Sequence, residues 1–355
     1  MISTNGGIAK SDQTAAEAGT SDSVWMSPLK TKQAITANTT GKNLVINGNF
    51  NSWQEGTSFA AIATNTFVAD LYSYQKVGAM VHTISRETDV PTVAESGHFS
   101  NYSLLIDCTT ADATVAATDL TYLAHRIEGY NFQKIAQKEF TVSFWHKHTK
   151  TGTYCVALKN SGDDRTYIAE YTQTTTDTWE KATITVAASP SAGTWDYTTG
   201  VGLSVNFTLV AGTTYQTTAD AWQTGDFFGT SNQVNACDNV LNNFRIARVQ
   251  VESGDTATDF ESESIQQEIV LIDRYLRYAR VRVTNNTDAE ELRAAFDYHY
   301  EMRVNPTASI TVDTGSGTTI SSTSQTFGAS NNGYVIQTTA NSSATGATIF
   351  LDARL

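Results

Sequence analysis

The sequence is poor in proline, cysteine and charge: 355 residues include four prolines and three cysteines, and 17% are charged. So few prolines argue against a proline-rich linker or stalk. Cys108, Cys155 and Cys237 are odd in number and widely spaced, which fits neither a disulfide framework nor a metal knuckle. We expect buried free thiols in a chain that folds under reducing conditions.

The sequence also lacks long apolar runs and any excess of basic residues. No stretch approaches the roughly 18 apolar residues that predict a membrane span, and the first residues lack the apolar core of a signal peptide. The absence of an apolar run predicts no membrane insertion. The formal net charge of −13 repels phosphate, so nucleic acid is not an expected partner. Low charge with abundant Thr, Ser, Asn and Gly favours polar-faced β structure over charged helices.

Alternating apolar residues predict strands through the middle of the chain. Phe140, Val142 and Phe144 alternate with other residues, and Thr151-Gly152 then leads into a second alternating run, which predicts a hairpin. The longest alternation covers nine positions and would spread around a whole helix, so it predicts a strand containing Val201, Leu203, Val205, Phe207 and Leu209.

The last strand of this region changes the phase of its apolar residues. Phe244 and Ile246 are followed by Val249 and Val251, and a bulge near Ala247 would return the apolar residues to one face. Many short strands separated by turn residues predict a two-sheet sandwich or a barrel.

Helical signals occur on both sides of the β region. Ser27-Pro28 predicts the start of a short helix that runs to Ile35. A second helix is predicted over residues 263–283, beginning with the capping box Ser264 and Gln267. Its apolar stripe either docks on the sandwich or forms a three-helix contact around a symmetry axis, and contains Ile265, Ile269, Ile272, Leu276 and Ala279.

The C-terminal part, residues 284–355, returns to β character with almost no charge. From Val304 onward the only charged residues are Asp313, Asp352 and Arg354. Strands so poor in charge have weak protection against edge-to-edge pairing. Burial against sister subunits would remove that liability, so this part predicts a homo-oligomer.

The sequence contains no catalytic constellation, so we predict no enzyme activity, no cofactor and no metal. It has no G-x-S-x-G elbow, H-E-x-x-H motif, Walker loop or dinucleotide fingerprint. Asp163 and Asp164 lie between two predicted strands and indicate a hairpin turn rather than an acid pair. His146 and His148 share one strand face just before a turn, where we expect solvent exposure rather than a metal site.

Two other kinds of site are compatible with the residue types present. A structural calcium ion could use Asn47, Asn49 and Asp255, but these residue types are too generic for a site prediction. Aromatic residues in turn-rich stretches are candidate glycan contacts, because sugar rings stack on aromatic faces. Structural packing is the alternative role for these residues, which are Trp195, Tyr197, Tyr215 and Trp222.

Several motifs resemble a β-sandwich family of bacteriophage tail fibres and related virion appendages. The opening N-L-x-x-N-G-x-F-x-x-W-Q at Asn43 is similar to that of jelly-roll carbohydrate-binding modules and phage fibre domains. The stretch Ala15–Ile35 resembles a segment that recurs in tail fibres. The most specific pieces of the likeness are RIEGYN (126–131), SFWHKHTKTGTY (143–154), TWEK (178–181), GTWDYTTGVGL (193–203) and VQVESGDTATDFE (249–261). In related domains the last motif often leads to a C-x-R-Y-Y-like motif, which Asp273-Arg274-Tyr275-Leu276 replaces in part here.

The resemblance implies a mainly β, jelly-roll-like β-sandwich in a non-enzymatic virion protein. It divides the chain into an N-terminal virion-attachment segment (1–42), the sandwich (43–262), a connecting helix (263–283) and a small C-terminal β domain (284–355). We predict a tail-fibre or receptor-binding homotrimer, assembled in the host cytoplasm, that adheres to host surface polysaccharide and contacts other virion proteins through residues 1–42. The alternatives are a purely structural capsid decoration, head fibre or tail adaptor, and a polysaccharide depolymerase.

Overall fold

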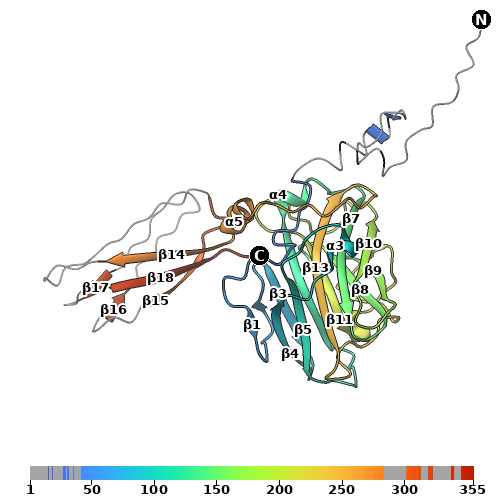
Figure 1. Ribbon diagram of the computed structural model, residues 1–355, viewed down its shortest axis with the longest axis horizontal. Helices are drawn as coiled ribbons and strands as arrows, with labels where there is room; N and C mark the ends of the chain where they lie inside the picture. Colours follow the sequence, from blue (N-terminus) through green and yellow to red (C-terminus); the bar gives the residue numbers. More distant parts are fainter. Residues whose placement is uncertain are drawn as a thin grey trace, which may run out of the picture.

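Two large antiparallel sheets face each other and enclose the core, as the computed structural model shows (Figure 1). The predicted sandwich is therefore confirmed. The residues that the structure describes are 41–283, 301–312, 319–322, 337–339 and 345–355, together with Ala15, Ala18, Ser27, Pro28, Lys30, Thr31 and Ile35. No helix in these parts of the chain is long and apolar enough to cross a membrane.

Each sheet combines strands from distant parts of the sequence. In spatial order, the six-stranded sheet contains β1 (Ser58–Phe59), β4 (Val81–Glu87), β5 (Ser103–Thr110), β13 (Asn243–Ser253), β7 (Phe140–His148) and β10 (Glu180–Val186). The seven-stranded sheet contains β12 (Trp222–Thr224), β9 (Arg165–Gln173), β8 (Gly152–Lys159), β11 (Val201–Ala211), β6 (Leu120–Glu128), β3 (Tyr72–Val77) and β2 (Thr66–Phe67). Short helical turns lie in the connections: α3 (Val93–Ser96), α4 (Gly129–Phe132) and η1 (Thr213–Tyr215).

The core forms where the apolar faces of the two sheets meet. Phe144 of β7 contacts Phe207 of β11 edge to face, with ring centroids 5.0 Å apart. Both rings are fully buried. Alternate residues of β11 point into the core, as the alternation predicted, so its polar residues occupy the opposite face.

The predicted bulge is present in β13. Its pairing with β7 shifts between Ala247 and Gln250, and Arg248 adopts a positive φ of 52°. The extra residue allows Phe244 before the bulge and Val251 after it to share the core.

The predicted hairpin around Thr151-Gly152 is wrong, because the two flanking strands lie in different sheets. β7 pairs with β10 and β13, whereas β8 pairs with β9 and β11. Gly152 has a φ of 139°, and a Cβ there would lie 2.6 Å from Val234. Glycine therefore permits a crossing from one sheet to the other. The turn at Asp163 does join a hairpin, that of β8 and β9, as predicted.

The connecting helix is shorter than predicted. α5 covers Ile265–Asp273 and has the predicted capping box at Ser264 and Gln267, but Leu276–Val283 form strand β14. β14 pairs with β18 (Thr345–Asp352), which supplies the tertiary interaction that overrides the helical spacing. The alternation of apolar with polar residues from Leu276 onward is also compatible with a strand.

The described C-terminal part is mostly β structure, apart from residues 301–306 and 353–355. β14, β18 and β15 (Thr307–Val312) form a three-stranded sheet with β18 in the middle, which extends away from the sandwich beyond α5 (Figure 1). β16 (Thr319–Ser322) pairs with β17 (Gln337–Thr339). β14 belongs to this C-terminal sheet although it precedes residue 284, where the C-terminal β domain was predicted to begin.

The chain enters and leaves the sandwich at one place. Both oxygens of the Glu261 carboxylate accept hydrogen bonds from backbone N–H groups, at 2.5 Å from Gly41 and 2.8 Å from Lys42 and Asn43.

In the N-terminal segment, the N–H of Lys30 donates to the Ser27 hydroxyl at 3.3 Å, which is the predicted helix cap. The attachment role predicted for residues 1–42 falls largely outside the described residues.

Candidate functional site

A row of three polar residues crosses the outer face of the seven-stranded sheet. Ser204 of β11 is the direct cross-strand partner of Arg126 in β6 and of Lys159 in β8. Their chain neighbours Ile127, Leu158 and Val205 point into the core, so the row faces away from it. Hydroxyl, guanidinium and ammonium groups therefore stand side by side on three adjacent strands.

The next row of residues creates a hollow beside the polar row. Asn206 is flanked by Ala124 on β6 and Ala157 on β8, and two such short side chains leave space above the sheet. The Asn206 amide donates to the backbone oxygen of Ala157 at 2.9 Å, and its Oδ1 accepts from Ser204 Oγ at 2.9 Å. We call the hollow the outer cleft; it has a volume of about 150 Å³ and is lined by Tyr122, Arg126, Lys159, Asn160, Ser161, Asp163, Val201, Ser204 and Asn206.

Lys159 carries the positive charge at one end of the outer cleft. Its ammonium group lies 2.7 Å from a carboxylate oxygen of Asp163, pairs also with Asp226, and lies 4.1 Å from the centroid of the Phe228 ring. Only 7% of its side chain is exposed. Two carboxylates and an aromatic face hold the ammonium in place, so the cleft has a fixed positive charge at this end.

Tyr122 and Arg126 form the opposite wall. The Tyr122 ring stacks on Phe228 with centroids 4.5 Å apart, and burial raises the pKa of its hydroxyl to about 12, so it stays protonated as a donor. Arg126 Nη1 donates to Ser73 Oγ at 2.9 Å and to the Leu355 oxygen at 3.1 Å. Burial lowers the pKa of the Arg126 guanidinium. An arginine nevertheless remains charged at neutral pH.

The outer cleft combines neighbouring donors and acceptors with an aromatic ring. Such a set suits a ligand rich in hydroxyl groups, which needs several oriented hydrogen bonds and one aromatic contact. The carboxylates of Asp163 and Asp226 are both paired with Lys159 and thus do not form a free acid pair. No cluster of metal-ligating side chains is found in the described parts of the chain. The arrangement offers hydrogen-bonding groups and an aromatic ring to a ligand.

Three of the four predicted glycan contacts gather elsewhere and pack on the core. Trp195 stacks on Phe132 at 5.2 Å and contacts Trp222 at 5.5 Å, while Tyr197 also stacks on Phe132 at 6.0 Å. The indole N–H groups of Trp195 and Trp222 donate to backbone oxygens. Their rings are half-buried. The geometry fits the packing alternative for these three residues, which cover one part of the core.

The fourth, Tyr215, lies beside the outer cleft. Its ring meets Phe228 edge to face at 5.8 Å, and Phe228 in turn contacts both Tyr122 and Lys159. Tyr215 thus belongs to an aromatic cluster on the outer face. It supports the cleft through Phe228 and does not line it.

The expected solvent exposure of His146 and His148 is wrong. Both imidazoles are buried, because their face of β7 points into the core. Gln173 lies 2.9 Å from His146 Nδ1, and His148 stacks on Tyr154 at 3.7 Å. Burial lowers the pKa of His146 to about 4 and also holds the pKa of His148 well below its usual value. The pair consists of neutral core residues.

The three thiols are free and buried, as predicted. Cys237 Sγ lies 3.3 Å from His82 Nε2, whose other ring nitrogen lies 2.6 Å from the Tyr74 hydroxyl. Interaction with Cys237 and with His82 lowers the pKa of Cys108 to about 5.

The three calcium candidates make other contacts in the structure. The Asn47 side-chain amide donates to backbone oxygens, and that of Asn49 donates to Glu268. The backbone oxygen of Asp255 accepts a hydrogen bond from Thr185. Each residue thus has a structural role of its own.

Sequence reasoning missed the residues of the outer cleft. The alternation of β11 identifies its core residues but does not say what the polar residues between them do. A signal was available: Lys159 is a long charged residue at the end of a largely apolar strand, and Arg126 is another within β6. Lys159 and Arg126 come together because β11 pairs with both β6 and β8. The residue pattern of a single strand does not show which strands it pairs with.

Comparisons with known proteins find similarity in fold only. No protein-family model matches the chain, and no curated protein matches it. Among solved structures, a family 61 carbohydrate-binding module in complex with β-1,4-galactotriose is 9% identical, with a TM-score of 0.31 over 60% of this chain and 100% of that chain. A protein from Bacteroides thetaiotaomicron described as sugar-binding is 11% identical, with a TM-score of 0.33 over 60% and 100%. A CBM4 module is 12% identical, with a TM-score of 0.32 over 59% and 99%.

Proposed function

We propose that this chain is a bacteriophage fibre or receptor-binding protein that adheres to host surface glycans. The motifs of the sandwich support the virion assignment through their resemblance to phage fibre domains. The outer cleft supports the binding half of the proposal. Its polar row, Arg126, Ser204 and Lys159, is the single observation that carries it, because these groups can hold several hydroxyls of one sugar at once.

Binding at one cleft is weak under this proposal, and copies on one particle add their effects. A cleft of about 150 Å³ encloses a small part of a polysaccharide. Several copies tethered to one particle raise the effective concentration of free clefts near the surface, so the particle adheres more strongly than the single protein. The protein acts by adhesion and is not an enzyme.

The test is a titration of the full chain with host polysaccharide and its oligosaccharide fragments, followed by calorimetry. Ser204→Trp places a large ring in the polar row and is expected to weaken binding at least about tenfold, roughly 1.4 kcal/mol. Thr183→Trp is the matched control, since Thr183 is an exposed strand residue on the other sheet, and it should bind as the unmodified protein does.

The outcomes separate this function from its rivals. Loss of binding in both variants, or in neither, would rule out the outer cleft as the glycan site. A protein that binds no host polysaccharide yet is found on the particle would favour the structural role, as decoration, head fibre or tail adaptor. Release of reducing ends from the polysaccharide would favour a depolymerase.

A further inference from the structure

A second hollow lies where the C-terminal sheet meets the sandwich. It has a volume of about 380 Å³, and we call it the junction hollow. Ligand pockets usually enclose about 300 to 1,000 Å³. The junction hollow is of that size, whereas the outer cleft, at about 150 Å³, is smaller. The residues that line the junction hollow are Phe67, Thr307, Ser309, Phe350, Asp352 and Arg354.

One face of the C-terminal sheet forms a wall of the junction hollow. Phe350 of β18 is the direct partner of Tyr278 in β14 and of Ser309 in β15. Two residues further along, Asp352 is the partner of Thr307, so both rows stand on the same side of the sheet. Thr307 and Ser309 are exposed. The Tyr278 ring is 40% exposed, and its centroid lies 4.7 Å from that of Phe350. The wall thus offers two hydroxyl groups next to an aromatic pair.

Arg354 lies against two phenylalanine rings that line the junction hollow. Its guanidinium carbon is 3.8 Å from the centroid of the Phe67 ring and 5.4 Å from that of Phe350. The guanidinium also pairs with Asp352, at 2.7 Å, and with Glu55. Only 4% of the Arg354 side chain is exposed. These contacts hold both rings in place, so the hollow has a fixed shape.

The junction hollow lies on the same outer face of the sandwich as the outer cleft. Asn206, in the cleft, is the partner of Ala124 on β6, and Ala124 is the partner of Ser73 on β3. Ser73 is in turn the partner of Phe67 on β2. Direct partners share one face of a sheet, so Asn206 and Phe67 belong to one row. Three strand spacings of ~4.8 Å place these two residues roughly 14 Å apart.

A third, small hollow of about 10 Å³ adjoins both of the others. Arg126 lines this small hollow and the outer cleft, while Phe67 and Arg354 line it and the junction hollow. Leu355 also lines it, and the Leu355 oxygen accepts a hydrogen bond from Arg126. Arg126 and Leu355 are half-buried, so both present part of their surface to solvent. The three hollows therefore follow one another across the outer face.

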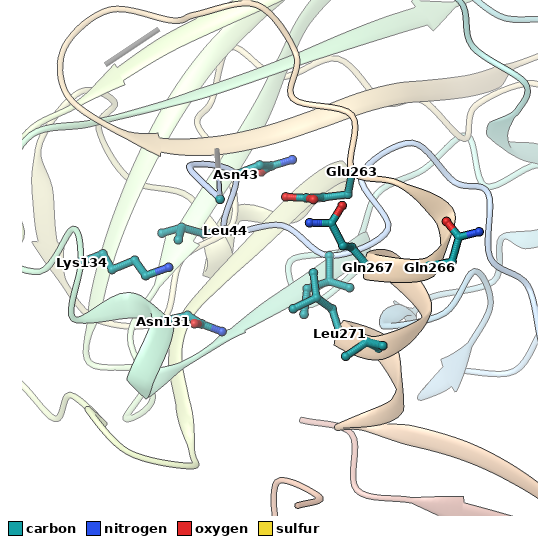
Figure 2. A pocket seen from close by; sticks show the side chains of 11 residues that line it. Asn43, Leu44, Asn131, Lys134, Glu263, Gln266, Gln267 and Leu271 are labelled. Carbon is teal, nitrogen blue, oxygen red and sulfur yellow. The ribbon is translucent and has the colours of Figure 1, made fainter. Parts of the chain in front are cut away.

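A larger hollow, of about 420 Å³, lies beside α5 and has a different character (Figure 2). Val270 and Leu271 form its helix wall, and Leu44 and Ile46 lie on the opposite side. We call it the α5 groove. Among the described residues, none that lines this groove also lines the three hollows of the outer face. The α5 groove thus provides a separate hollow of similar size in which to place a control substitution.

We propose that the outer cleft and the junction hollow bind one ligand together, an internal stretch of a linear polysaccharide. The inference rests on the proposed function and adds a second contact site and a ligand class, a chain of several sugar rings rather than a single terminal sugar. Phe350 supplies an apolar ring surface, and Thr307 and Ser309 supply hydroxyl groups. One sugar ring does not span the ~14 Å between the two sites, whereas an oligosaccharide does. Once one end is bound, the other binds intramolecularly, so affinity rises with length.

The first test is calorimetric titration of the full chain with oligosaccharides of increasing length, prepared from a host polysaccharide. Fragments that reach both hollows are expected to bind at least about tenfold more tightly than the shortest fragments that bind, because the second contact is intramolecular. One long fragment is expected to bind per chain. Equal affinity at every length, or two long fragments bound per chain, would overturn the proposal.

The second test fills the junction hollow with a large ring. Ser309→Trp should remove the gain in affinity with length and leave the affinity for the shortest fragments unchanged. Thr307→Trp fills the same hollow from the neighbouring row and should act alike, so the test does not depend on the folding of one variant, which circular dichroism checks. Leu271→Trp in the α5 groove is the matched control, since Leu271 is 43% exposed, and should keep the gain.

Ser204→Trp distinguishes failure of this inference from failure of the proposed function. It is expected to weaken the binding of fragments of every length. If Ser204→Trp weakens binding while Ser309→Trp and Thr307→Trp change nothing, the outer cleft binds glycan alone and the inference is wrong, although the proposed function stands. If no fragment binds, or if none of these substitutions changes binding, the inference and the proposed glycan site are both wrong.

Discussion

Arg274 and Glu128 form a two-pronged ion pair, with Nη2 2.5 Å from Oε1 and Nε 2.9 Å from Oε2. The Glu128 side chain is 1% exposed, and the Tyr275 hydroxyl also donates to Oε2 at 2.7 Å. The contact joins the residues that follow α5 to the end of β6. It connects two of the sequence motifs, RIEGYN and the Arg274-Tyr275 pair, and so gives both a structural role.

The first prediction concerns this ion pair. Arg274→Ala leaves the Glu128 carboxylate buried without its cation and should lower the free energy of unfolding by about 2 to 3 kcal/mol. This loss is smaller than that expected for a fully buried pair, because Arg274 is about one third exposed. Glu128→Gln in the same chain removes the stranded charge, so the double variant should be more stable than Arg274→Ala. Urea unfolding of the single and double variants measures this. If the losses in the two single variants simply added in the double variant, the two side chains would not be energetically coupled, which would contradict the prediction.

The second prediction concerns Gly48 in the opening motif N-G-x-F. A Cβ at this position would lie 2.2 Å from the backbone oxygen of Val249, which cannot move without disturbing β13. Gly48→Ala should therefore destabilise the sandwich by about 3 kcal/mol or prevent folding, as thermal or urea unfolding would measure.

Gly97→Ala is the matched control for this change. Gly97 has a φ of 76°, and no atom lies within 4 Å of the position that a Cβ would take, so only backbone strain of about 1 kcal/mol is expected. Equal losses in the two variants would show that close approach to Val249 is not what requires glycine at residue 48.

The third prediction concerns the buried histidines. Burial lowers the pKa of His125 to about 3 and that of His146 to about 4, from a usual value of about 6.5. As the pH falls below about 6.5, the unfolded chain takes up protons that the folded chain does not. Stability that is fully present above pH 6.5 is therefore lost toward pH 4 and 3, by about 1.4 kcal/mol per pH unit for each histidine.

Denaturation midpoints between pH 7 and pH 5 measure this slope, in a range above the titration of most carboxylates. His125→Phe should make the slope shallower. A pH-independent midpoint in the unmodified protein would contradict the burial of neutral imidazoles.

The fourth prediction separates packing from ligand contact at Trp222. Its half-buried ring contacts Trp195 and Tyr167, so Trp222→Ala should cost about 2 kcal/mol, below the 3 to 5 kcal/mol of a fully buried ring. Glycan affinity of the folded variant, measured by calorimetry, should not change. A loss of glycan affinity with unchanged stability would mean that Trp222 contacts the glycan, as the sequence suggested.

Much of the sandwich was predictable because its signals are local. Alternation in β11, the phase change at Ala247 and the capping box at Ser264 each lie within a few neighbouring residues, and the structure confirms all three. The hairpin prediction at Gly152 failed for the opposite reason. Whether two successive strands pair or cross to opposite sheets depends on partners far away in sequence, which for β7 and β8 include β10 and β11.

The candidate site was hidden for the same physical reason. The outer cleft exists because β11 lies between β6 and β8, which aligns Arg126 with Ser204 and Lys159 and sets Ala124 and Ala157 beside them. Each residue alone resembles an ordinary strand residue. The predicted end of α5 was too late because Leu276 fits both a helical stripe and an alternating strand, and pairing with β18 decides between them.

The hydrogen bonds from Gly41, Lys42 and Asn43 to Glu261 have an evolutionary consequence. Because the two ends of the sandwich meet at one carboxylate, a different body could be joined at the same two borders, provided that it also supplied a carboxylate for Arg274 as Glu128 does here. Under the proposed function, a virus lineage could thus acquire new recognition by recombination at these two borders, while its assembly parts stay as they are.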